Sequence, residues 1–144
     1  MSLAEEIRND PLGLGYAAHL PSAPGAVADL INAPTQSMVK PRYVTARTIL
    51  AECNDGAPIL DALQTIGQTV SAVKWMMTFL QQDSGIDAGH PKTQATIDNL
   101  VTLGALPSAY GDQLKALAIQ PASRAEVLGL PVVTIHDLIE AGVV

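Results

Sequence analysis

The sequence predicts an all-α protein: a single compact domain, residues 1–144, with about seven or eight short helices around a buried central helix at about 69–82. Two observations favour this fold. Apolar residues recur at the three- and four-residue spacing of a helix face, and Pro, Gly and capping residues separate the periodic segments. The predicted central helix contains the only Trp and the only Phe, Trp75 and Phe79. It is apolar on most sides, which is typical of a helix covered by its neighbours.

A short helix opens the chain. Ser2 and Glu5 have the spacing of a capping box, and Asp10 precedes a proline, a position that disfavours helix. Residues 10–25 form a loop rich in Gly and Pro that still carries apolar groups to bury. The pattern then predicts helices at about 23–32, 42–54 and 57–66, with a further loop at 35–41.

The second half of the chain follows the same rules. The most polar loop, residues 83–92, comes directly after the central helix. Thr134 and Asp137 have capping-box spacing at the start of the last helix. The pair at 132–133 is the one strand-like dipeptide, and it is too short to predict a strand. Further helices are expected at about 91–103, 107–118, 123–128 and 134–141.

Composition limits the classes of function. The net charge is −6 with only eight Lys and Arg, which disfavours nonspecific nucleic-acid binding. Charged residues make up only 15% of the chain, so we expect surplus apolar surface and hence an oligomer or a subunit of a larger assembly. Cys53 is the only cysteine, which excludes an internal disulfide and predicts a small buried side chain. No secretory signal or membrane-spanning apolar run is visible.

The motifs do not predict catalysis. The glycine pair in PLGLGYA lacks the third glycine of a dinucleotide-binding loop. The histidines stand singly, and the pair His136 and Glu140, at helical spacing, is the nearest approach to a metal site. The loop at 83–92 lacks calcium ligands, because Gly85 and Gln94 occupy two of the required positions. We therefore expect no enzymatic activity, no cofactor, no metal and no small-molecule substrate.

A basic segment lies in the first half of the chain. Lys40, Arg42 and Arg47 are its cations, and residues 30–51 contain no Asp or Glu. We interpret the segment as a solvated face or an ion-pairing surface between subunits. Nucleic-acid contact is the alternative, but three charges supply little energy from counterion release at physiological salt.

The C-terminal segment has the spacing of a helix-turn-helix unit. Ala125, Gly129 and Ile135 occupy its small, turn and apolar positions. The second helix would present Asp137 and Glu140 to DNA phosphates, and this disfavours DNA binding.

Two end segments, LAEEIRNDPLGLGYA and SRAEVLGLPVVTIHDLIEAG, resemble a family of small uncharacterised proteins of tailed bacteriophages. That family has an N-terminal DPLG-x-GYA segment and a C-terminal SRA-x-x-LGL segment, and Leu14 stands here where the family usually has Arg. The resemblance implies a phage-encoded protein and carries over no activity or catalytic residue. The matching positions are Ile7, 10–13, 15–17, 123–125, 128–130, Val133, Asp137 and Leu138.

We also predict that the two end segments pack together. In this hypothesis the DPLGLGY loop packs on the SRA–LGL turn, and Tyr16 is the anchor. Arg8 and Arg124 lie near acidic residues in sequence, Asp10 and Glu126 respectively. The contact would hold the two ends of the chain around the helical core.

Together these observations predict a non-enzymatic protein–protein interaction protein, a structural or assembly subunit of a phage head, neck or tail. Its partners would be other phage proteins or further copies of itself, in the host cytoplasm during assembly and in the virion if it is structural. The alternative is a small phage regulator that binds a host or phage protein, or DNA through the C-terminal helix pair. The residues predicted to make interactions are Asp10, Leu12, Leu14, Tyr16, Lys40, Arg42, Arg47 and Arg124.

Overall fold

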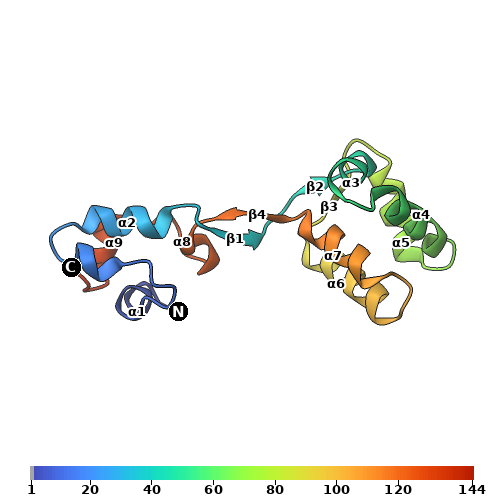
Figure 1. The fold of residues 1–144 in the computed structure, drawn as a ribbon. Helices are drawn as coiled ribbons and strands as arrows, with labels where there is room; N and C mark the ends of the chain where they lie inside the picture. The colour runs from blue at the N-terminus through green and yellow to red at the C-terminus, as the bar shows by residue number, and fades with distance from the viewer. Residues whose placement is uncertain (1) are drawn as a thin grey trace. The chain divides into compact units, whose positions relative to one another are not determined.

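The structure, a computed structural model, describes residues 2–144 and is mainly helical with a small amount of sheet (Figure 1). The helical character is as predicted, but the fold is not strictly all-α. The chain divides into two compact units. Unit 1 comprises the chain up to Met38 together with Pro121–Val144, and unit 2 is Val39–Gln120. Each unit has its own hydrophobic cluster, whereas the sequence predicted one core.

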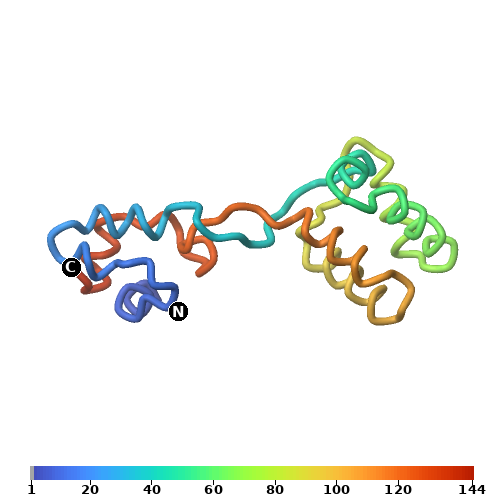
Figure 2. The backbone as a smooth tube through the Cα atoms, in the orientation of Figure 1, coloured from blue at the N-terminus to red at the C-terminus, as the bar shows by residue number. Residues whose placement is uncertain are grey.

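Unit 1 is built from both ends of the chain. Figure 2 shows N-terminal and C-terminal segments, blue and red, side by side within this unit. Helix α2 contacts three of the other elements, η1, α8 and α9. The unit 1 helices are α1 (Leu3–Asn9), the 3-10 helix η1 (Tyr16–His19), α2 (Pro24–Asn32), α8 (Arg124–Val127) and α9 (Ile135–Glu140). Its buried cluster is Ile7, Tyr16, Val27, Ala28, Ile31, Ala125, Val133 and Leu138.

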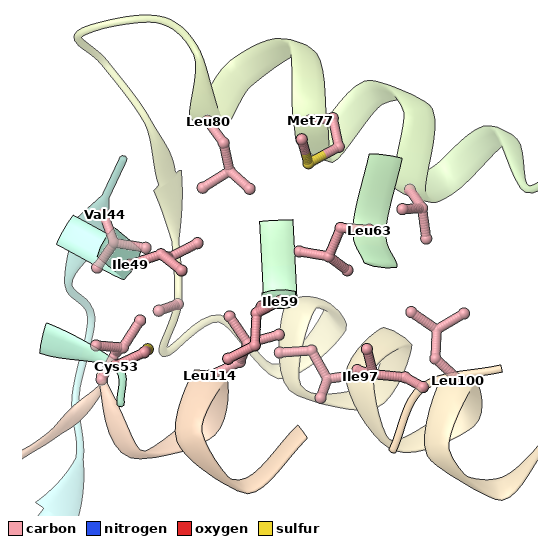
Figure 3. Packing of buried hydrophobic residues seen from close by; sticks show 14 of the residues in the cluster. Val44, Ile49, Cys53, Ile59, Leu63, Met77, Leu80, Ile97, Leu100 and Leu114 are labelled. Atoms are coloured by element: carbon pink, nitrogen blue, oxygen red, sulfur yellow. The ribbon is translucent and has the colours of Figure 1, made fainter. Parts of the chain in front are cut away.

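Unit 2 is continuous in sequence. Neighbouring helices pack in sequence order, α3 on α4, α4 on α5 and α6 on α7. Their apolar faces meet in one core, to which five helices and β2 contribute side chains (Figure 3). The helices are α3 (Ala46–Glu52), α4 (Gly56–Gly67), α5 (Ser71–Leu80), α6 (Pro91–Thr102) and α7 (Ser108–Ala116).

Four short strands form two two-stranded sheets. β1 (Gln36–Val39) pairs with β4 (Ile119–Ala122), and the chain passes between the units within these strands. β2 (Tyr43–Val44) pairs antiparallel with β3 (Ile86–Asp87). Loops were predicted at β1 and β3 and a helix at β2, and β4 begins just after the helix predicted at about 107–118. Strands this short are set by partners distant in sequence, so they leave no alternating pattern of their own.

The predicted buried helix is only half covered. In α5, Val73, Met77 and Leu80 are buried on the side that faces the unit 2 core. Trp75 and Phe79 lie on the other side with 58% and 45% of their surfaces exposed. The prediction that Trp75 is a core residue is therefore wrong. A helix that is apolar on all sides is buried only if other elements cover each side. Within its unit α5 packs chiefly on α4, so its other side stays exposed.

Candidate functional site

The DPLGLG motif is a loop closed by a single carboxylate. Asp10 ends α1 in the left-handed conformation (φ 40°) and donates its N–H to the Glu6 carbonyl. Its Oδ1 accepts the N–H of Leu14 at 2.7 Å, and its Oδ2 accepts the N–H of Gly15 at 2.9 Å. Gly13 and Gly15 have φ values of 65° and 88°, a region that L side chains rarely adopt. Asp10 therefore has a structural role in shaping the loop.

A buried polar network joins the two ends of the chain in unit 1. Glu6 is fully buried, and its Oε1 accepts the Tyr16 hydroxyl at 3.1 Å. Arg124 donates through Nε to Oε1 at 2.8 Å and through Nη2 to Oε2 at 3.1 Å. Burial, strengthened by the Glu6 carboxylate, raises the pKa of Tyr16. In the described part of the chain no buried side-chain nitrogen or oxygen lacks a hydrogen-bond partner, and for Glu6 these bonds provide the partners.

The predicted contact between the two end segments is confirmed in part: the ends meet, but they form a cluster of their own instead of enclosing the helical core, and a different acid lies at the centre. Tyr16 is completely buried in one cluster with Ala125. Arg124 pairs with Glu6, whereas the sequence analysis placed Glu126 and Asp10 nearest the two arginines. The burial of Glu6 could have been predicted from helical spacing, because position 6 falls on the same face of α1 as the apolar residues Leu3 and Ile7.

Five of the predicted interaction residues lie in unit 1, and they are divided between structural positions and the surface. Asp10, Tyr16 and Arg124 hold unit 1 together. Leu14 is half-buried against the unit 1 cluster, and Leu12 remains 46% exposed.

The predicted basic segment is only partly a surface. The Arg42 guanidinium forms a two-pronged pair with Glu52, at 3.0 and 2.6 Å, and also donates to the Leu117 carbonyl at 2.9 Å. The hydrogen bonds from Arg42 hold the pKa of Glu52 below its usual value. Arg47 is exposed beside residues 80–83 at the C-terminal end of α5. Arg42 therefore links the end of α3, through Glu52, to the residue that follows α7, through the Leu117 carbonyl. Its charge is neutralised by Glu52.

The polar loop after α5 has a packing role. Asp87 Oδ1 accepts the N–H groups of Arg42 and Gly89, each at 2.9 Å. A Cβ placed on Gly85 or Gly89 would lie 2.1 Å from the Val44 carbonyl oxygen or 2.0 Å from the Lys40 carbonyl oxygen. Both glycines are required by the close approach of two backbones. No pattern in the sequence signals this role, because the strand between the two glycines is only two residues long and its partner is distant in sequence.

The outer side of α5 is an exposed apolar stripe. Ala72, Trp75 and Phe79 are exposed and Met76 is half-buried, at the spacing of one helix face. The Lys74 ammonium lies 5.8 Å from the centre of the Trp75 ring, a cation–π contact. We name these four apolar residues the α5 outer stripe.

Unit 1 has a hollow of about 390 Å³ between α1 and α9, the α1–α9 hollow. Leu3 and Ala4 line it from α1, and apolar residues of 130–133 line it from the segment before α9. Asp137 and Glu140 of α9 also line it. Glu140 is well exposed and lies 3.1 Å from His136. The hollow therefore combines an apolar lining with carboxylates.

The remaining candidate groups take structural or surface positions. Among residues 2–144 no three His, Cys, Asp or Glu side chains gather as a metal site would require. His90 caps α6, where its Nδ1 accepts the Lys92 N–H at 3.1 Å. Cys53 is buried, as predicted, and burial raises the pKa of its thiol. No helix in the described part of the chain is long and apolar enough to cross a membrane.

The C-terminal helix pair does not strengthen the case for DNA binding. α8 is a single turn, Arg124–Val127, and its Arg124 is turned into unit 1 to meet Glu6. α9 carries Asp137 and Glu140, which phosphates repel.

Comparisons of this chain with protein-family models, with curated proteins and with solved structures find no match.

Proposed function

We propose that this chain is a non-enzymatic protein–protein interaction protein, a structural or assembly subunit of a tailed-phage particle. The resemblance of its two end segments to a family of tailed-phage proteins supports the proposal that the chain belongs to a phage. The sparse charge of the chain, 15% of residues, supports an assembled state in which part of the surface is covered.

The observation that carries the proposal is the α5 outer stripe. An exposed Trp beside an exposed Phe on one helix face is unusual for a surface that stays in water, because large aromatic groups gain most from burial. Tryptophan is also enriched among the residues that dominate binding energy at protein interfaces. The stripe is therefore best explained as a surface that a protein partner covers.

The polar groups support a non-enzymatic role. Three charged residues that the sequence analysis predicted to make interactions hold the fold instead: Arg124 with Glu6, Arg42 with Glu52, and Asp10 with backbone N–H groups. A catalytic group must be able to reach a substrate, and these groups are committed to their present partners.

Quantitative mass spectrometry of purified particles tests the proposal. In particles of a phage that encodes this chain, we expect the protein at a fixed copy number relative to the other virion proteins. Absence from particles, with synthesis early in infection, would contradict the structural role and favour the regulator.

A matched pair of variants tests the surface. A phage lacking the gene is complemented with Trp75→Ser or with Leu103→Ser, which also removes an exposed apolar side chain of unit 2. We expect W75S to reduce particle yield at least tenfold and L103S to complement fully. Equal complementation by both variants would show that the α5 outer stripe is not the interaction surface.

A further inference from the structure

The two units differ in charge. The fourteen carboxylates of the chain divide equally between them, but of the eight Lys and Arg only Arg8 and Arg124 belong to unit 1. Arg124 is neutralised by Glu6 inside unit 1. Unit 1 therefore has a marked excess of negative charge, whereas unit 2 is close to balanced.

The α5 outer stripe is a projecting apolar surface with a positive charge. Trp75 is its largest exposed group, and Lys74 lies against the ring. Helix α5 contains no Asp or Glu between Ser71 and Leu80. A matching partner surface would be concave, apolar and negatively charged.

The α1–α9 hollow has these three properties. Its floor is apolar, from Leu3, Ala4 and the segment 130–133. Its volume of about 390 Å³ falls within the range of natural ligand pockets, which hold groups larger than one aromatic side chain. Asp137 and Glu140 supply negative charge. The Asp137 carboxylate is held by the N–H and hydroxyl of Thr134, whereas Glu140 contacts the exposed His136 side chain, at 3.1 Å, and is itself well exposed to a partner.

From this complementarity we infer that the chain associates head to tail, with the α5 outer stripe of one copy seated in the α1–α9 hollow of a second copy. Trp75 fills the hollow and Lys74 meets Glu140. This inference rests on the proposed interaction function and names the partner as the chain itself. Because the two contacting surfaces differ, a pair of copies still has one stripe and one hollow open, and the association extends into a ring or a filament.

Trp75 is the only tryptophan, so its fluorescence reports directly on the contact. On the full-length chain, sedimentation velocity and Trp emission are measured together over a wide concentration range. We expect the sedimentation coefficient to rise with concentration and the emission to shift to shorter wavelength as the ring leaves water. Added salt should oppose both changes, because it screens the charges of Lys74 and Glu140.

Two variants remove the contact from opposite sides. Trp75→Ser removes the projecting group, and Ala4→Lys places a long cationic side chain in the hollow, where it repels Lys74. Each is expected to weaken association about tenfold or more, as loss of a central aromatic anchor does. Leu103→Ser and Ala18→Lys, at exposed sites away from both surfaces, are the matched controls and should leave association unchanged. Circular dichroism melts verify that each variant is folded. If A4K does not fold, Glu140→Lys takes its place as the variant that alters the hollow.

Mixing the two variants decides between pairing modes. W75S keeps its hollow and A4K keeps its Trp75, so the mixture should form one-to-one dimers that do not grow further. The emission of A4K should shift only when W75S is added. Self-association that persists in A4K alone would indicate that α5 stripes pair with each other and would overturn the inference. Failure of the mixture to associate, although each variant has lost self-association, would overturn it as well.

A wild-type chain that stays monomeric at all concentrations would also overturn it. That result would leave the proposed function standing, because the protein could still be found in particles with a different partner on α5.

Discussion

The two units achieve stability in different ways. Unit 1 is assembled from segments at opposite ends of the chain, and polar side chains fasten them. Asn32 exchanges two hydrogen bonds with the backbone of Val133, at 2.8 and 2.9 Å, and Glu6 holds Arg124. Unit 2 is one continuous segment whose helices pack in sequence order around a larger apolar core.

This difference predicts where single substitutions matter. A buried charge is tolerated only while its partner is present, so unit 1 should be sensitive to the loss of one polar group. In unit 2 the ion pairs Arg42–Glu52 and Lys115–Asp98 are partly exposed and contribute little, and the apolar core and close backbone contacts dominate. Substitutions at Arg124, Gly89, Tyr16 and Trp75 separate these two kinds of stability.

Arg124→Ala leaves the Glu6 carboxylate buried without its cation. We expect unit 1 to lose about 3 kcal/mol of unfolding free energy, within the range measured when one partner of a buried pair is removed. Hydrogen exchange of unit 1 peptides measures the loss. The double variant Glu6→Met with Arg124→Met, which removes both charges, should be far closer to the wild type. A double variant as unstable as R124A would show that packing, not the unpaired charge, is responsible.

Gly89→Ala forces a Cβ to within 2.0 Å of the Lys40 carbonyl oxygen. Two backbones must move apart, and we expect unit 2 to lose about 2 kcal/mol, typical of overpacking. Trp75 lies in unit 2, so its fluorescence during urea unfolding reports on this unit. Gly25→Ala in unit 1 is the control and is followed by hydrogen exchange of unit 1 peptides, because Trp75 does not report on that unit. A Cβ on Gly25 meets only the Ile135 side chain, at 3.8 Å, so this substitution should be neutral or slightly stabilising. Equal effects of the two substitutions would refute the close-approach argument.

Tyr16→Phe removes one buried hydrogen bond to Glu6 and should cost unit 1 about 1 kcal/mol. The raised pKa of Tyr16 means that the folded state favours the protonated phenol. The Tyr16 phenol therefore stabilises the folded state below the ordinary phenol pKa of about 10, and this contribution is lost as the pH rises above that value.

Hydrogen exchange or circular dichroism melts at neutral and at alkaline pH measure both effects. The wild type should weaken more than Y16F as the pH is raised. Tyr110→Phe, at a partly buried tyrosine of unit 2, is the control and should be nearly neutral. A Y16F protein with unchanged alkaline sensitivity would contradict the role given to the phenol.

Trp75→Ser should change the stability of unit 2 by no more than about 0.5 kcal/mol, because more than half of the side chain is exposed and its ring contacts Lys74, which is also exposed. Met77→Ala, on the buried side of the same helix, should cost about 2 kcal/mol or more. Thermal melts by circular dichroism compare the two. A large cost at Trp75 would restore the prediction of a core helix.

Sequence patterns predicted the helices well because each helix carries its own apolar period and end signals. The capping boxes at Ser2, Ser123 and Thr134 are present in the structure, and of these the sequence identified the first and the last. The contact between the end segments could also be predicted, since Tyr16 and the SRA turn belong to conspicuous motifs.

Other features had no local signal. The division into two units depends on which apolar faces meet, and a period of 3.6 residues does not say which partner a face will find. The same ambiguity made α5 look buried, because Trp75 and Val73 are equally apolar in sequence. The role of Gly89 depends on Lys40, which lies in a distant part of the chain.

The chain has two units with separate cores, and these should lose structure independently. Hydrogen exchange of the full-length R124A protein, followed peptide by peptide by mass spectrometry, measures whether they do. Loss of protection should be confined to residues up to 38 and to 121–144, with protection in 39–120 equal to that of the wild type. A comparable loss throughout 39–120 would show that the chain unfolds as one cooperative body and would contradict the account.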